Sequence, residues 1–189
     1  MKQLLVCCFI LMGFLANAQE GLDRLLARYN SHTVPYISVE KIKNLGASPR
    51  GMNWRILLKN CEASLGELNP LEGLKMRSKD NNLILLDARK PEEFKVSHLK
   101  SAKFVGYSNF STEKISHVIK DKSSLVVVYC SLGIRSENIS EKLQKEGYTN
   151  VRNLYGGIFE WKNKGYTIFN NAGEPTEKVH LFQKTGLNG

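Results

Sequence analysis

The chain has 189 residues, and its 27 Lys and Arg outnumber its 18 Asp and Glu, which gives a formal net charge of +9. This length is enough for one domain with a proper hydrophobic core. The basic residues are scattered and form no stripe with interleaved aromatic residues, so the sequence predicts no nucleic-acid partner. A basic surface suits small anionic substrates or acidic partners equally well.

Residues 1–18 have the pattern of a cleavable export signal. Met1-Lys2 gives a short positive region, Leu4 to Leu15 form an apolar core, and Ala16-Asn17-Ala18 matches a small-x-small cleavage site. The apolar core is too short to cross a bilayer as a helix, and no later run approaches the necessary length, so we expect no stable membrane span. The sequence therefore predicts a protein exported to the periplasm or the cell exterior.

Residues 19–82 form an N-terminal extension in which the first structural elements are expected. Apolar side chains recur at the spacing of one helical face over 21–29, at Leu22, Leu25, Leu26 and Tyr29. The run 34–37 predicts a short edge strand, since Pro35 cannot donate a hydrogen bond in a central ladder. Ser38 is the predicted cap of a helix that continues to about Leu45. Residues 47–80 predict an irregular insertion with a helix or two.

From residue 83 to residue 169, strands alternate with helices. Strands are expected over 83–86, 102–105, 125–129 and 151–154, and helices over 91–94, 112–119, 137–147 and from Gly157 to about Gly165. The continuous β-branched run at 126–128 is typical of a strand buried on both faces. Short connections between alternating strands and helices predict an α/β domain with a parallel sheet covered on both faces. The tail, 170–189, is polar and is expected to be extended or loose.

The segment after the central strand contains the residue that most strongly suggests chemistry. Cys7 and Cys8 belong to the predicted signal, so Cys61 and Cys130 remain. Cys130 follows the strand directly and lies in the loop before the predicted helix, whose positive end and backbone amides favour an anion there. A free thiol has a pKa of about 8.5, and a helix N-terminus with a nearby cation can lower it to about 3.5–7.5. The sequence therefore predicts a thiol that ionises readily.

Three ordered motifs resemble those of the rhodanese family. The first is Asp87-x-Arg89, followed by Glu93-Phe94, His98-Leu99 and Ala102. The second is the loop Cys130-x-x-Gly133-x-Arg135-Ser136, and the third is Gly156-Gly157 with Trp161. The resemblance covers residues 83–169, just under half of the chain, and the strand and helix over 36–45 could supply the first unit of the domain.

The resemblance implies both a fold and an activity. The family fold is a three-layer α/β/α arrangement around a parallel sheet of five strands in the order 3-2-4-5-1. Family members take a sulfane sulfur from a donor such as thiosulfate or polysulfide, form a cysteine persulfide, and pass the sulfur to cyanide, a small thiol or a protein acceptor. By resemblance, Cys130 is the nucleophile, no cofactor is required, and the anion is bound by the loop residues Ser131, Leu132, Gly133, Ile134, Arg135 and Ser136.

The loop chemistry is consistent with that implied role. Gly133 allows a backbone geometry that is strained for other residues, successive amides can form an anion-binding nest, and Arg135 supplies a permanent positive charge. Leu132 and Ile134, however, make the loop apolar, and Arg135 is its only cation. Thiosulfate is therefore in doubt as the true donor.

Three alternatives remain open. Cysteine phosphatases hold a phosphoryl group in a Cys-x5-Arg loop, but the interval here is Cys130-x4-Arg135, a smaller ring that favours sulfur. A non-catalytic rhodanese module could serve as a persulfide carrier or a binding domain. A thiol–disulfide role would pair Cys130 with Cys61 and needs their Cα atoms within about 7 Å; otherwise Cys61 is expected to be a small buried apolar residue.

The remaining polar candidates are expected to be structural. Asp87 and Arg89 lie at the carboxyl end of a strand, where sites of open α/β sheets gather, but a structural ion pair is favoured. His98 could act as a base, yet sulfur transfer to a thiolate needs none, so a hydrogen-bonded structural histidine is expected. The four histidines and two remaining cysteines show no zinc-ligand spacing, and no metal site is predicted.

Overall fold

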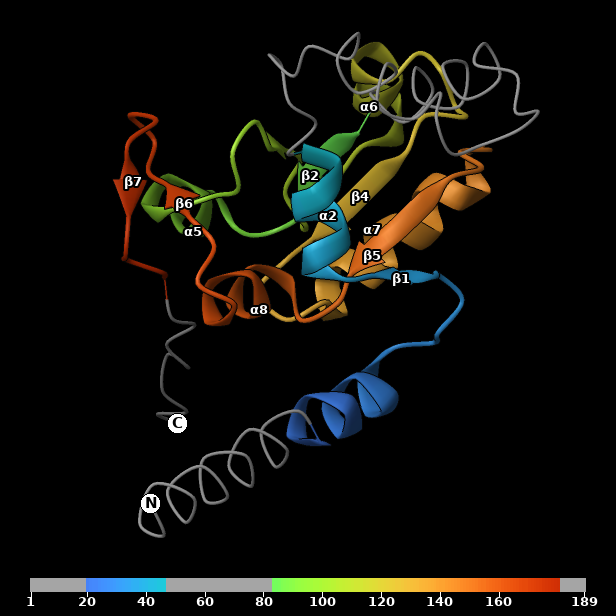
Figure 1. Ribbon diagram of the computed structural model, residues 1–189. Coiled ribbons are helices and arrows are strands. Elements are labelled where there is room, and N and C mark those ends of the chain that lie inside the picture. The colour runs from blue at the N-terminus through green and yellow to red at the C-terminus, as the bar shows by residue number, and fades with distance from the viewer. Residues whose placement is uncertain (1–19, 47–82, 181–189) are drawn as a thin grey trace, which may run out of the picture.

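The computed structural model describes residues 20–46 and 83–180 (Figure 1). Five strands form one parallel sheet in the order β1-β5-β4-β2-β3. Their bounds are Tyr36–Ile37 (β1), Ile84–Asp87 (β2), Lys103–Phe104 (β3), Val126–Tyr129 (β4) and Val151–Leu154 (β5). The expected α/β class, the parallel sheet and the implied strand order are all confirmed, and β1 lies at the edge as Pro35 predicted.

Two layers of helices cover the sheet, and each encloses its own apolar cluster. Helices α2 (Val39–Gly46) and α8 (Gly157–Asn163) pack on one face, where Ile42 and Ile158 join Val127. Helices α6 (Thr112–Val118) and α7 (Ile134–Lys145) pack on the other, where Ile115 and Ile139 join Val128. The short helix α5 (Pro91–Val96) follows β2, and Figure 1 shows it beyond the end of that strand. The chain is therefore a three-layer α/β/α structure.

Strand β4 is the centre of the sheet. All four of its residues are buried, because alternate side chains enter the two opposite apolar clusters. β4 pairs with β2 and β5, and its last residue, Tyr129, lies beside Asp87, the last residue of β2. The residues that follow β2 and β4 consequently meet at one edge of the sheet.

Two local expectations differ from the structure. Helix α7 begins at Ile134 rather than at Glu137, because Gly133 adopts a left-handed conformation with φ of 109° and starts the helix three residues earlier. The tail from residue 170 is expected to be extended or loose, and the hairpin in which its strand β7 (Pro175–Thr176) pairs antiparallel with β6 (Ile168–Phe169) is not predicted. The hairpin attaches to the body through an antiparallel bridge between Phe169 and His98.

The N-terminal helix occupies residues 20–29, close to the expected range. Leu26 is buried, whereas Tyr29 is 61% exposed, so the predicted apolar stripe is only partly covered. The predicted signal, the insertion over 47–80 and Cys61 lie outside the described residues. Within the described part of the chain, no helix is both long enough and apolar enough to cross a bilayer.

Candidate active site

Cys130 lies at the junction between β4 and α7, in a loop that now comprises only Cys130 to Gly133. It is a free thiol and is 2% exposed. Its side chain belongs to neither apolar cluster of the sheet. The sulfur instead lies within the loop, where the Gly133 amide donates a hydrogen bond to Sγ at 3.1 Å. The thiol is thus held in a polar setting at the N-terminal end of a long helix.

A buried polar network behind the loop fixes this geometry. Ser136 Oγ lies 3.5 Å from the sulfur and bonds to Asn153 Oδ1 at 2.7 Å. Asn153 Nδ2 donates to the Gly133 carbonyl at 2.7 Å and to Glu137 Oε2 at 2.8 Å. Asn153 is fully buried within β5, so the strand itself holds Gly133 in position.

The start of α8 supports the loop from a second direction. The amide of Ile158 donates to the Cys130 carbonyl at 2.9 Å, and the amide of Phe159 donates to the Ser131 carbonyl at 3.2 Å. These bonds require a close approach at Gly157, where an added Cβ would lie 2.3 Å from the Cys130 oxygen. The Gly156-Gly157 motif therefore has a packing reason as well as a conformational one.

The N-terminal helix contributes a third support. Asn30 Nδ2 donates to the Gly133 carbonyl at 3.0 Å and to Tyr36 Oη at 2.7 Å. Leu26 Cδ2 lies 3.5 Å from where a Cβ on Gly133 would stand. Asp23 accepts a hydrogen bond from Tyr155 Oη, beside the glycine motif. A segment far away in sequence thus packs directly on the Cys130 loop.

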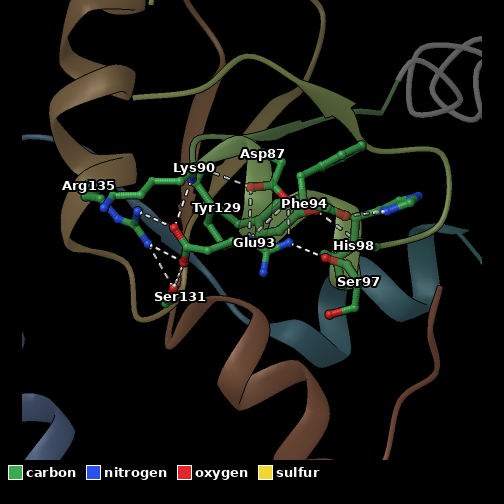
Figure 2. A network of polar contacts seen from close by, with 11 residues as sticks. Asp87, Lys90, Glu93, Phe94, Ser97, His98, Tyr129, Ser131 and Arg135 are labelled. Atoms are coloured by element: carbon green, nitrogen blue, oxygen red, sulfur yellow. Dashed lines mark hydrogen bonds and ion pairs between the residues drawn. The ribbon is translucent and has the colours of Figure 1, made fainter. Parts of the chain in front are cut away.

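Arg135 lies in the first turn of α7 and is held by Glu93 of α5. Its Nη1 donates to Glu93 Oε2 at 2.7 Å and its Nη2 to Glu93 Oε1 at 2.8 Å. Ser131 Oγ bridges the pair, since it bonds to Glu93 Oε1 and accepts from Arg135 Nη2, both at 2.9 Å. Figure 2 shows Arg135, Glu93 and Ser131 directed toward one another, with Lys90 beside them. The cation of the loop is therefore paired with a carboxylate inside the protein.

The interactions of Glu93 and Arg135 favour the charged form of both side chains. Burial alone would raise the pKa of Glu93, but hydrogen bonds from Arg135 and the Lys90 amide, with the charge of Arg135, bring it from 4.5 to about 2. Burial would likewise lower the pKa of Arg135, yet its bond to Glu93 and the negative charges of Cys130 and Glu93 raise it. Both partners are therefore charged at neutral pH.

Asp87 and Arg89 form a second, separate ion pair at the end of β2. Arg89 Nη2 lies 2.7 Å from Asp87 Oδ2, and both side chains are fully buried. Arg89 also donates to the Ser97 carbonyl and lies over the ring of Tyr129. Burial raises the pKa of the Tyr129 phenol well above its usual value, so the ring stays neutral. This pair joins β2, β4 and the end of α5 and does not contact the sulfur.

His98 lies on the outer side of the same region, and Figure 2 shows its ring beside Phe94. The two rings stack with centroids 4.2 Å apart, and His98 Nδ1 lies 3.2 Å from the Phe94 carbonyl. Its backbone pairs with Phe169. These contacts anchor the hairpin to α5.

The structure thus sorts the predicted site residues into groups. Gly133 and Ser136 contact the Cys130 sulfur. Ser131 and Arg135 bind Glu93, and a hydrogen bond to the Cys130 side chain also helps to raise the pKa of Arg135. Leu132 and Ile134 are partly exposed apolar side chains at the loop surface. Within residues 20–46 and 83–180, no group of three or more potential ligand side chains comes together to hold a metal ion.

Sequence reasoning gave no role to Glu93, Asn153 or Asn30. Glu93 is an acid in the first turn of a helix that follows a strand end, and Arg135 in the loop is a basic residue that could pair with it. Asn153 was visible as a polar residue inside an otherwise apolar strand, which requires buried hydrogen-bond partners. Asn30 gave no such signal, because its contact with Gly133 depends on the tertiary fold.

Part of the chain is similar in sequence to two named enzymes. It is 29% identical over 181 residues to the tRNA uridine(34) hydroxylase of Aster yellows witches'-broom phytoplasma, covering 80% of this chain and 57% of that protein. It is 33% identical over 96 residues to the enzyme of the same name from Cytophaga hutchinsonii, covering 50% and 30%. The chain therefore spans less than two thirds of the length of these relatives.

Two solved structures are also similar to part of this chain. A rhodanese with anions from E. coli is 29% identical, and the match covers 47% of this chain and 99% of that one with a TM-score of 0.41. A thiosulfate sulfurtransferase from Pseudomonas aeruginosa is 20% identical, covering 67% and 23% with a TM-score of 0.45. The sequence profile of the rhodanese-like domain matches residues 70–164, which include Glu93, the Cys130 loop and the glycine motif. The chain belongs to the rhodanese-like domain family.

Proposed function

We propose that this protein is a sulfurtransferase that carries a sulfane sulfur as a persulfide on Cys130. The observation that supports this most directly is the position of a free thiol at the N-terminal end of α7, with the Gly133 amide on its sulfur. The helix dipole and that amide favour an anionic sulfur, whether thiolate or persulfide. Family membership makes this chemistry the natural candidate for the site.

The proposed reaction has two steps. The Cys130 thiolate attacks the outer sulfur of a donor, the S–S bond of the donor breaks, and its electron pair leaves with the donor remnant, which is sulfite in the case of thiosulfate. The outer sulfur of the persulfide is then attacked by a small thiol, cyanide or a protein thiol, and the electron pair returns to Cys130. The transfer requires no cofactor.

Turnover tests this proposal against its closest rival. The wild-type protein should convert polysulfide and cyanide to thiocyanate, and Cys130→Ser should not. The same preparation should leave an aryl phosphate intact, since Cys130 and Arg135 are separated by one residue fewer than in the phosphatase loop. Aryl phosphate turnover that depends on Cys130, without thiocyanate formation, would overturn the proposal.

The curated relatives provide a second candidate substrate. One of them, named a tRNA uridine(34) hydroxylase, aligns with 80% of this chain. Incubation with tRNA, followed by mass analysis of the nucleosides, tests that activity. We expect no hydroxylated uridine, because the basic residues are scattered along the sequence and form no stripe. Hydroxylation at position 34 that requires this protein would favour the second candidate.

A further inference from the structure

The charges next to Cys130 indicate which sulfur donors the site can accept. Arg135 is the only basic side chain of the Cys130–Ser136 segment. Two parallel hydrogen bonds join it to Glu93, and the side chains are 19% and 1% exposed, respectively (Figure 2). A bidentate pair of this kind fixes both orientation and charge. The positive charge expected to attract an anionic donor is therefore already balanced.

Two further polar groups near the sulfur are also engaged. The Gly133 amide donates to Sγ, and the Ser131 hydroxyl is shared between Glu93 and Arg135. The partly exposed side chains of this segment are Leu132, Ile134 and the paired Arg135. Lys90, the N-cap residue of α5, is exposed, so solvent and salt screen its charge. Within the described Cys130–Ser136 segment, the partly exposed side chains are thus two apolar residues and one cation whose charge Glu93 balances.

Glu93 stays ionised throughout the physiological pH range, because its pKa is about 2. The balance of charge is thus permanent. A thiolate that attacks a doubly charged donor brings three negative charges together, whereas a singly charged donor brings two. Because Glu93 balances the charge of Arg135, the extra charge repels the thiolate over a few ångströms in a partly desolvated site.

We propose that the Glu93–Arg135 ion pair makes Cys130 select singly charged organic sulfur donors, of the type R–S–S⁻ or R–SO₂–S⁻, over the doubly charged thiosulfate. Leu132 and Ile134 contact the organic group of such a donor. This inference rests on the proposed function, since it assumes that Cys130 accepts sulfur. It adds the charge class of the donor and names Glu93 as a specificity-determining residue.

A matched pair of donors isolates the effect of charge. The methanethiosulfonate anion, CH₃SO₂S⁻, differs from thiosulfate only by a methyl group in place of one charged oxygen. Attack by Cys130 on the outer sulfur gives the persulfide in both cases and releases methanesulfinate or sulfite with the bonding electron pair. The rate of sulfur addition to the protein is measured by intact mass and divided by the rate with free cysteine, which removes the intrinsic reactivity of each donor.

The wild-type protein should favour methanethiosulfonate by about tenfold or more in this normalised rate. Glu93→Gln keeps the size of the side chain but removes its charge, so it should raise the normalised thiosulfate rate by about tenfold. Glu92→Gln is the matched control, because it changes the total charge equally on an exposed neighbour in α5 and should alter the rate by less than about twofold.

The outcomes separate the two claims. Equal normalised rates, or a preference for thiosulfate, in the wild-type protein would overturn the donor selectivity and leave the sulfurtransferase proposal standing. Failure of both donors to add sulfur would overturn the proposed function. If Glu93→Gln does not fold, as judged by circular dichroism, the wild-type comparison decides alone. If it folds and its thiosulfate rate matches that of Glu92→Gln, Glu93 does not determine specificity.

Discussion

At the scale of single residues, Glu93 connects the charge of the site with the stability of the fold. Its carboxylate is nearly fully buried and binds Arg135, Ser131 and the Lys90 amide. A buried charge of this kind is tolerated only when its partner is present, so removal of either partner costs several kcal/mol. Glu93 therefore supports both the loop geometry and its electrostatics.

The pH dependence of stability follows from the depressed pKa of Glu93. Because this pKa falls from 4.5 to about 2 in the folded protein, the carboxylate stabilises the fold above its ordinary pKa and loses that contribution as the pH falls toward 2. The shift corresponds to about 3 kcal/mol at neutral pH. Urea unfolding of wild type and Glu93→Gln should therefore show a stability gap at neutral pH that closes in acid. A gap that is the same at both pH values would contradict this role.

Some residues could be foreseen because their signals are local. The Asp87–Arg89 pair follows from two charges at the end of a buried strand. Ser111, directly before the predicted start of α6 at residue 112, caps that helix by accepting a hydrogen bond from the Lys114 amide. The Glu93–Arg135 pair joins residues 42 positions apart, so it depends on how α5 and α7 approach each other. The sequence alone does not show that α5 and α7 lie close together.

At the scale of elements, the approach of α8 to the loop depends on a glycine without a side chain. Gly157→Ala would place a Cβ 2.3 Å from the Cys130 carbonyl, so the loop must move, and we expect a loss of more than about 3 kcal/mol in stability together with slower sulfur loading. Gly165→Ala is the matched control. Its φ is also positive, but nothing lies within 4 Å, so only about 1–2 kcal/mol of backbone strain is expected. Equal losses in the two variants would contradict the packing argument.

The N-terminal helix over 20–29 is a structural part of the site. Leu26 is 2% exposed and packs toward Gly133, so Leu26→Ala should cost about 2–4 kcal/mol and slow sulfur loading. Tyr29→Ala removes a larger but exposed side chain from the same helix and should change stability by less than about 0.5 kcal/mol. Denaturant midpoints of both variants test this. A Leu26 variant as stable as wild type would show that the helix does not support the loop.

The elements differed in how far the sequence could define them. The strand β4 was clear because four consecutive buried positions give an apolar run. The start of α7 was missed because the left-handed Gly133 begins the helix before its periodic pattern appears. The β6–β7 hairpin was missed because each strand has only two residues, too few to show alternation.

At the scale of the whole molecule, residues 1–18 remain a predicted export signal. We propose that the chain is cleaved after Ala18 and acts outside the cytoplasm. Expression of the full chain in a bacterium, followed by mass analysis of the exported fraction, should give a mature protein that begins at Gln19. Ala18→Arg, which removes the small residue required at the cleavage site, should leave the precursor uncleaved. A cytoplasmic protein that retains Met1-Lys2 would contradict the prediction.

The account as a whole depends on a Cys130 sulfur that can accept and hold a second sulfur. The most direct measurement is the intact mass of the mature protein after incubation with a persulfide or polysulfide donor. We predict a gain of one sulfur atom that cyanide removes and that is absent in Cys130→Ser. An unchanged mass in the wild-type protein, or the same gain in Cys130→Ser, would contradict the central claim.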